Sequence, residues 1–519
     1  MRSKRFAVLI LTILLCQWSA IARAQKSTVV GQFENQSDIG KVKRPGSATY
    51  NAARQEYTVE GSGVNMWFNS DQFHMVWKRM KGDFILQTTA HLLGKGVDPH
   101  RKLGWIVRSG LDSSAAHINA AVHGDGLTSL QFRRTAGGTT EEKKSTLTAA
   151  DVIQLARHGN TYTMSVARNG QPFVSEEVTD LNLGDEVYVG LFVCSHNPDV
   201  SEKALFTNVR VIVPARDNFV PYREYIGSCL ELMDVASGHR TVIYQSPESL
   251  QAPNWLPNNK ALIYNSKGGL YRFDLKTKTP TLINSDFATN NNNDHVLSFD
   301  GKQLGISHHS KDDNNQSVVY TMPTTGGKPK RVTAVTTGPS YLHGWSPDSR
   351  ELVYTAQRNG DFDIYKINAN GGQEIKLTEG KPLDDGPEYA PDGKYIYFNS
   401  TRTGTMQIWR MKADGSEEEQ ITNDGYNNWF PHISPDGKWM TILSFSTDVK
   451  PDDHPFYKQV YLRLLPIADG NPAKETPKVI AYIYGGQGTI NTPSWSPDSK
   501  QLSFISNTSL LDIPGPKAR

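Results

Sequence analysis

Two histidines stand at corresponding positions in neighbouring copies of a repeated sequence. His295 lies in DHVLSFDG and His343 in LHGWSPDS, at a position where the other four copies have proline. Proline suits the first residue of a strand, which can forgo its hydrogen-bond donor. An imidazole can instead act as a general base or bind a metal ion near neutral pH. His295 and His343 are therefore the candidate catalytic residues, although buried histidines that only make structural hydrogen bonds fit the same pattern.

A third imidazole belongs to the same repeat copy as His295. His308 lies in HHSKDD, directly after the second strand of that copy. Imidazoles from His295, His308 and His343 would suit a divalent transition metal, with Gln487 or a carboxylate as a further ligand. A divalent metal is thus the candidate cofactor, while HHSKDD could equally be a solvated loop.

Other loops of the repeat carry polar and aromatic side chains. Asp385 and Glu388 offer carboxylates for sugar hydroxyls, for calcium or for acid–base chemistry. Tyr426 and Trp429 offer rings that could stack on a sugar, and Trp429 could equally be a core residue. His454 lies in the longest loop between strands, where it could cover the site. The predicted ligand-binding residues are Asp385, Glu388, Tyr426, Trp429, His454, Gln487 and Asn491.

The elements that must position these residues form a tandem repeat. A strand, the turn SPDG or a variant of it, and a second strand recur in six copies, the first at residue 252 and the last at residue 492. Such a period, about 40–50 residues, is typical of β-propeller blades. The last copy stops after two strands, and the missing pair precedes the first copy, in residues 229–246. The two ends should therefore close one blade of a six-bladed ring without free sheet edges.

One face of this ring should collect the candidate residues. In a propeller, the segment before each inner strand and the loop between the second and third strands emerge around the same mouth of the central channel. The candidate residues fall in these segments, whereas the SPDG turns form the opposite face.

The repeat resembles that of TolB-type, WD40-like propellers. The shared pattern is WSPDGKxIxFxS followed by DIYxxxxxGGxxxxLT, and it extends over residues 228–508. The resemblance implies a six-bladed propeller and a role as a periplasmic scaffold that binds an envelope protein.

The preceding half of the chain has a different sequence pattern, without the repeat. Residues 26–215 contain many short strand patterns separated by turn residues, which is typical of a β-sandwich. The segment resembles concanavalin A-like and laminin-G-like jelly-roll domains, which often bind glycans. The predicted fold is all-β, with a jelly-roll sandwich at 26–215, a linker at 216–227, the propeller at 228–508 and a tail at 509–519.

The first residues predict export. A basic start, a short apolar run and the Ala22–Arg23–Ala24 site indicate a signal peptide over residues 1–24, cleaved near Ala24. The mature chain should be periplasmic or secreted, without a membrane span. In the full sequence 55 Lys and Arg balance 53 Asp and Glu, which excludes a strongly basic nucleic-acid-binding surface. Cys194 and Cys229 could form one disulfide or remain free thiols.

Two functions follow from these patterns. The first is an exported protein that binds or processes carbohydrate at the propeller mouth; as an enzyme it would be a polysaccharide lyase or a glycoside hydrolase. The alternative is a non-catalytic TolB-like scaffold that binds an envelope protein or peptide. The expected partner is accordingly a glycan, an oligosaccharide or an envelope protein.

Overall fold

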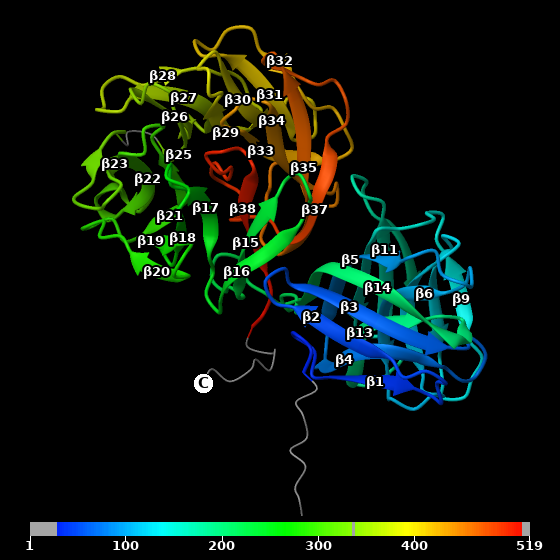
Figure 1. The fold of residues 1–519 in the computed structure, drawn as a ribbon. Coiled ribbons are helices and arrows are strands. Elements are labelled where there is room, and N and C mark those ends of the chain that lie inside the picture. Colours follow the sequence, from blue (N-terminus) through cyan, green and yellow to red (C-terminus); the bar gives the residue numbers. More distant parts are fainter. Residues whose placement is uncertain (1–28, 335–337, 511–519) are drawn as a thin grey trace, which may run out of the picture.

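The computed structural model describes residues 29–334 and 338–510. Two β-rich units follow one another along the chain (Figure 1). The predicted signal peptide lies outside the described residues, as does most of the predicted tail. In the part of the chain that the structure describes, no helix is long and apolar enough to cross a membrane.

The first unit consists of two seven-stranded antiparallel sheets, with the strand orders β1-β4-β13-β6-β7-β8-β9 and β12-β11-β10-β5-β14-β3-β2. Its strands are β1 (Asn35–Ile39), β2 (Ser47–Asn51), β3 (Glu56–Gly63), β4 (Phe73–Lys81), β5 (Phe84–Leu93), β6 (Lys102–Arg108), β7 (His117–His123), β8 (Thr128–Arg133), β9 (Glu141–Lys144), β10 (Val152–His158), β11 (Thr161–Ala167), β12 (Val174–Val178), β13 (Glu186–Cys194) and β14 (Asn197–Ile212).

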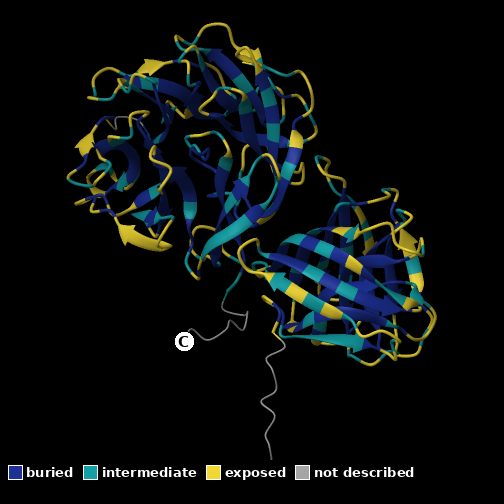
Figure 2. Ribbon diagram, in the orientation of Figure 1, coloured by how far each residue is buried: buried dark blue, intermediate teal, exposed yellow. Residues whose placement is uncertain are grey.

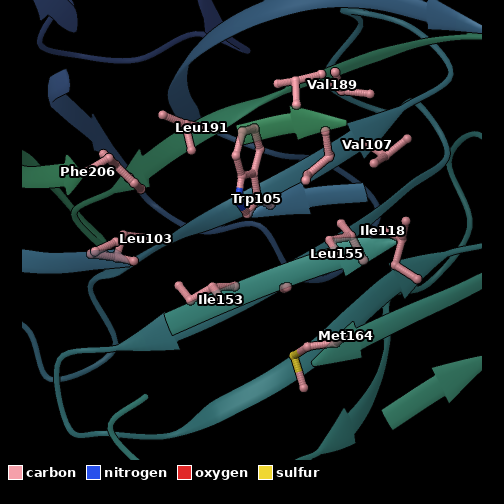
Figure 3. Close-up of a cluster of buried hydrophobic side chains, with 14 of the residues drawn as sticks. Leu103, Trp105, Val107, Ile118, Ile153, Leu155, Met164, Val189, Leu191 and Phe206 are labelled. Atoms are coloured by element: carbon pink, nitrogen blue, oxygen red, sulfur yellow. The ribbon is translucent and has the colours of Figure 1, made fainter. Parts of the chain in front are cut away.

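A single apolar core lies between these two sheets. Trp105 and Val189 come from one sheet, Leu155 and Phe206 from the other, and all four are buried in the same cluster (Figure 3). Successive side chains of a strand point to opposite faces, so the alternate residues of β6 leave this core. The two packed sheets agree with a sandwich, while the jelly-roll and concanavalin-like assignment stays a prediction.

The second unit is a propeller with six blades, as the repeat predicts. Blades one to four are β17 (Gln251–Trp255) to β20 (Thr279–Leu282), β21 (Asn291–Leu297) to β24 (Lys330–Arg331), β25 (Ser340–Trp345) to β28 (Ile375–Lys376), and β29 (Asp384–Tyr389) to β32 (Glu419–Gln420). Their middle strands are β18 (Ala261–Ser266), β19 (Gly269–Asp274), β22 (Gln303–Ser310), β23 (Gln316–Pro323), β26 (Glu351–Arg358), β27 (Asp361–Asn368), β30 (Tyr395–Ser400) and β31 (Gln407–Lys412), and the short helix η1 (Lys311–Asp313) follows β22. The outermost strands of these blades are largely exposed (Figure 2).

Blades five and six depart from this plain order. Blade five contains β33 (Asn427–Ile433), β34 (Trp439–Phe445), β35 (Lys458–Ala468) and β37 (Lys478–Gly485), and β36 (Asn471–Pro472) forms a small hairpin with β35. In blade six, β38 (Gln501–Asn507) pairs with β15 (Ser228–Asp234), which pairs with β16 (Arg240–Ser246). The predicted closure of the ring by both ends of the repeat is confirmed.

The turns between the first two strands of the blades adopt the predicted left-handed conformation. Gly393 and Gly437 have φ of 71°, and Asn259 and Ser349 have φ of 59° and 58° at the corresponding position. Asparagine and serine take the position of glycine here at a modest conformational cost.

One carboxylate connects the closing blade to the first unit. Glu231 lies in β15, is fully buried, and binds Arg210 of β14 at 2.6 Å and Arg240 of β16 at 2.9 Å. Ser506 of β38 donates a hydrogen bond to the same carboxylate at 2.5 Å. Burial alone would raise the pKa of Glu231, but the two guanidinium groups outweigh it and hold the pKa well below its usual value. The units are thus joined through a buried charge network.

Further contacts fix the two units against each other. Gln87 of β5 donates to the backbone oxygen of Tyr482 at 3.1 Å, and the ring of Phe173 packs on that of Tyr482 at 4.4 Å. Gly170 forms a β-bridge with Val479. Cys194 and Cys229 are buried free thiols, one in each unit, so the disulfide alternative is wrong.

We expect Glu231→Gln to destabilise the protein by about 3–5 kcal/mol, because two buried guanidinium groups lose their counter-charge. Denaturant unfolding at pH 7 measures the change. Since the lowered pKa means that Glu231 contributes its stability above the unfolded pKa and loses it on acidification, the difference should shrink at low pH. Glu186→Gln, which affects an exposed ion pair with Lys81 at 4.0 Å, is the matched control. Equal effects of the two substitutions would contradict this role of Glu231.

Candidate functional site

Bulges in the inner strands turn side chains toward the mouth of the propeller. In β29 the strand register shifts between Asp385 and Glu388. In β25 it shifts between Leu342 and Gly344, so His343 lies within the bulge. The same irregularity occurs in β17, β21 and β33. A bulge bends its strand and re-aims a side chain. Pro253, Pro387 and Pro431 lie within three of these bulges and His343 lies within another, whereas His295 pairs with Ile306.

A cavity of about 780 Å³ occupies the mouth. It is lined by all six blades and by part of the chain that joins the two units. Five of the predicted site residues line this cavity: His343, Asp385, His454, Gln487 and Asn491. Carboxylates, amides and aromatic rings dominate its lining. The mouth is therefore a recessed polar site and is not filled by apolar side chains.

Asp385 is the most strongly held of these groups. Its carboxylate accepts a hydrogen bond from Thr355 at 2.6 Å and one from the backbone N–H of Gly386 at 2.7 Å. It lies 3.3 Å from Nε2 of His343 and 4.0 Å from Nε2 of His454. Burial raises the pKa of Asp385, but the hydrogen bond and charge of His343, with His454 and Thr355, lower it to about 2. The carboxylate is ionised throughout the physiological range.

His343 lies between two carboxylates, Asp385 and Asp294. Burial lowers the pKa of its imidazole, but the charge of Asp294 and the hydrogen bond and charge of Asp385 outweigh burial and raise it. The ring also stacks on Phe430 at 6.2 Å. His343 is thus held among the acidic side chains of the mouth by its contact with Asp385.

Asp294 is the buried acid that sequence reasoning missed. Burial and the nearby charge of Asp385 raise its pKa to about 6, although His343 opposes the shift. Asn292 donates to its carboxylate at 2.7 Å. Asp294 directly precedes His295, so its position at the bulge of β21 was the available signal. An acid kept in a site that raises its pKa is typical of functional sites.

His295 does not reach the cavity. It is fully buried, with Nδ1 2.9 Å from the backbone oxygen of Asn293 and Nε2 3.4 Å from that of Ile263. Burial lowers its pKa to about 4. His295 therefore takes the alternative role of a histidine that joins neighbouring strands. Although His295 and His343 share a repeat position, the bulges of β21 and β25 aim them differently.

The structure does not bring the three predicted metal ligands together. His308 packs against the rings of Phe287 and Tyr320, away from the cavity. His295 faces backbone oxygens and His343 faces carboxylates. Within residues 29–334 and 338–510, these three histidines form no cluster of metal-binding geometry.

Three predicted ligand-binding residues also lie elsewhere. Glu388 is buried and binds Nδ1 of His432 at 2.5 Å and the backbone N–H of Ile433 at 3.0 Å, so it joins blades four and five. Trp429 is fully buried in an apolar core, where its ring contacts His454 at 4.4 Å. Tyr426 covers the guanidinium of Arg463 at 4.7 Å. The predicted aromatic sugar platform is therefore not present at the mouth.

Aromatic side chains from an unexpected segment form the rim of the cavity. Tyr222 and Tyr225, in the predicted linker, line it and pack against Phe456 with ring distances of 5.3 and 5.6 Å. Ile226 donates its backbone N–H to the hydroxyl of Tyr457 at 3.1 Å. The chain between the two units is thus packed on the loop 446–457 and contributes to the site.

Comparison with known proteins agrees with this architecture. The family model of the TolB beta propeller domain, PD40, matches residues 336–450. An uncharacterized protein of Agrobacterium fabrum is 42% identical over 279 residues, which are 54% of this chain and 92% of that protein. A solved structure from Agrobacterium tumefaciens, provisionally named TolB, is 41% identical with a TM-score of 0.51, and the match covers 55% of this chain and 99% of that one.

The fold and the cavity define a β-propeller protein with a charged cavity at its mouth, and the similarities show its family. The chain belongs to the family of TolB-type β-propeller proteins. TolB of Acinetobacter baumannii is 18% identical with a TM-score of 0.39, over 50% of this chain and 64% of that one, and at this level it carries no argument about function.

We expect Asp294→Asn to stabilise the protein at pH 8. The pKa of Asp294 is raised from 3.8 to about 6, so the folded state holds a proton that the unfolded state releases. This group's contribution to stability is full below pH 3.8 and is lost as the pH rises through about 6. A shift of this size is worth at most about 3 kcal/mol.

The melting temperature of Asp294→Asn, compared with wild type at pH 4 and pH 8, measures this effect. The gain should appear at pH 8 and fade at pH 4. Asp312→Asn replaces an exposed carboxylate and should change neither value. The same gain at both pH values would show that Asp294 carries no raised pKa.

Proposed function

We propose that this protein is a TolB-like, non-catalytic scaffold whose propeller mouth binds a positively charged, extended segment of an envelope protein. The observation that carries the proposal is the charge of the cavity. Glu248, Asp294, Asp385 and Asp452 line it. Among the basic side chains of the lining, Lys267 is paired with Glu248 at 2.6 Å and His343 lies 3.3 Å from Asp385, so the carboxylates remain in excess. Such a site attracts a cationic group and repels an anionic one.

The neutral lining residues fit a peptide. The segment 290–293, which enters β21, contributes four asparagines to the lining, and Asn265 donates to the backbone oxygen of Asn292 at 2.8 Å. Amide side chains can both donate to and accept from a peptide backbone. Tyr222, Tyr225 and Phe456 place ring faces at the rim, which favours lysine or arginine through cation–π contacts. Together these groups suit an extended basic segment.

Carbohydrate processing is the weaker candidate. Of the two candidate bases, His295 is buried against backbone oxygens, and Nε2 of His343 is already engaged by the carboxylate of Asp385 at 3.3 Å. The rings that would have stacked on a sugar, Tyr426 and Trp429, lie outside the cavity. A periplasmic location, which the sequence predicts from its first residues, agrees with an envelope partner.

Binding of linear peptides to the full chain tests the proposal. An array of basic, acidic and neutral peptides is probed with labelled protein, and the best basic peptide is titrated by fluorescence anisotropy. We expect selective binding of basic peptides that weakens with salt. Asp385→Asn and Asp452→Asn should each raise Kd about tenfold, which is about 1.4 kcal/mol.

Asp348→Asn is the matched control, because Asp348 lies in the same blade as His343 but in the SPDS turn on the opposite face. It should leave Kd unchanged. Equal loss in Asp348→Asn, or no preference for basic peptides, would contradict the proposed site. Retention of neutral oligosaccharides on a glycan array, with loss in Asp385→Asn, would support the carbohydrate reading instead.

A further inference from the structure

A second cluster of ionisable side chains lies at one end of the first unit. His123 ends β7, Asp125 lies in the turn to β8, and His100 lies in the loop before β6. One ligand-type atom of each residue lies within 4.8 Å of those of the other two. Among residues 29–334 and 338–510, this is the one group of three or more His, Cys, Asp or Glu with such geometry.

Backbone hydrogen bonds hold the two loops of the cluster together. The N–H of Gly124 donates to the oxygen of Arg101 at 2.8 Å, and the N–H of Asp125 donates to the oxygen of Pro99 at 2.8 Å. The register of β6 and β7 places Lys102 opposite His123. The sheet thus positions His123, and backbone hydrogen bonds fix the two loops that carry His100 and Asp125, as a preformed site requires.

One member of the cluster has an unused, buried lone-pair position. His123 is only 5% exposed, and its Nδ1 has no hydrogen-bond partner. Its Nε2 lies 3.5 Å from the amide nitrogen of Gln131. A buried polar atom without a partner is costly, and a bound ion would relieve that cost.

Neighbouring groups provide a second layer around the cluster. His196 lies beside His100 with a ring distance of 5.5 Å, and its Nδ1 is 3.4 Å from the carboxylate of Asp98. Asp98 also accepts the backbone N–H of His100 at 2.7 Å. These contacts fix the backbone at His100 and place a further imidazole beside the cluster.

We propose that His100, His123 and Asp125 bind a transition-metal ion of the Zn²⁺ type. Two imidazole nitrogens and one carboxylate oxygen are ligands that Zn²⁺ prefers, whereas Ca²⁺ and Mg²⁺ prefer oxygen alone. Three protein ligands leave the fourth position of a tetrahedral ion for water or for a group of a bound molecule. The exposed side chains of His100 and Asp125 place that position at the surface. The site is separate from the propeller mouth, so it stands or fails independently of the proposed function.

Calorimetric titration of the full chain, prepared metal-free and without a polyhistidine tag, tests this site. We expect one Zn²⁺ per chain and weak or absent Ca²⁺ binding. His100→Ala and Asp125→Asn replace exposed residues, so both variants should fold and lose at least tenfold in Zn²⁺ affinity. Co²⁺ should give the visible absorption of a low-symmetry, four-coordinate ion in wild type and lose it in both variants.

His91→Ala is the matched control, because His91 is an exposed histidine of the same unit outside the cluster. It should bind Zn²⁺ as wild type does. Absence of Zn²⁺ binding, a preference for Ca²⁺, or an equal loss in His91→Ala would overturn the proposal. So would full Zn²⁺ affinity in the combined His100→Ala and Asp125→Asn variant.

Discussion

The closure of the propeller ring by β38 and β15 is the constraint on which the rest of the structure depends. A ring closed by strands from both ends of the repeat has no free sheet edge, and unfolding of one end opens the whole ring. Glu231 lies at this closure and binds Arg210, Arg240 and Ser506 at once. The same side chain that joins the closing strands therefore also joins the propeller to the sheets that precede it.

This mode of closure determines what surrounds the mouth. In the other blades one continuous loop joins the second strand to the third at the mouth, whereas in blade six these strands come from opposite ends of the repeat. The chain that enters β15 must pass this face, which is why Tyr222 and Tyr225 reach the cavity. The first unit consequently lies beside blades five and six (Figure 1), where it contacts Tyr482 and Val479. The segment 216–227, which the sequence predicts to be a linker, therefore forms part of the cavity lining.

The sequence alone predicted the architecture well and the site in part. Six turn motifs and the displaced strand pair define a closed six-bladed ring, because turn residues and strand alternation are local properties. His343, Asp385, His454, Gln487 and Asn491 lie in the lining of the cavity, as blade topology predicts by assigning loops to faces, and their role in ligand binding stays a prediction. His295, Glu388 and Trp429 do not line the cavity. The direction of each of these side chains depends on a local bulge and on the packing of the next blade, which the sequence pattern does not reveal. Asp294 was missed for the same reason, and Tyr222 and Tyr225 because their position follows from the ring closure.

Hydrogen–deuterium exchange of the full chain, with and without a basic peptide selected on it, tests most directly whether the mouth is the ligand site. The account predicts added protection in three segments that are far apart in the sequence, around residues 222–225, 290–294 and 452–456. It predicts no added protection in the SPDG turns on the opposite face. Protection confined to those turns or to the first unit, or a failure to select any basic peptide, would contradict it.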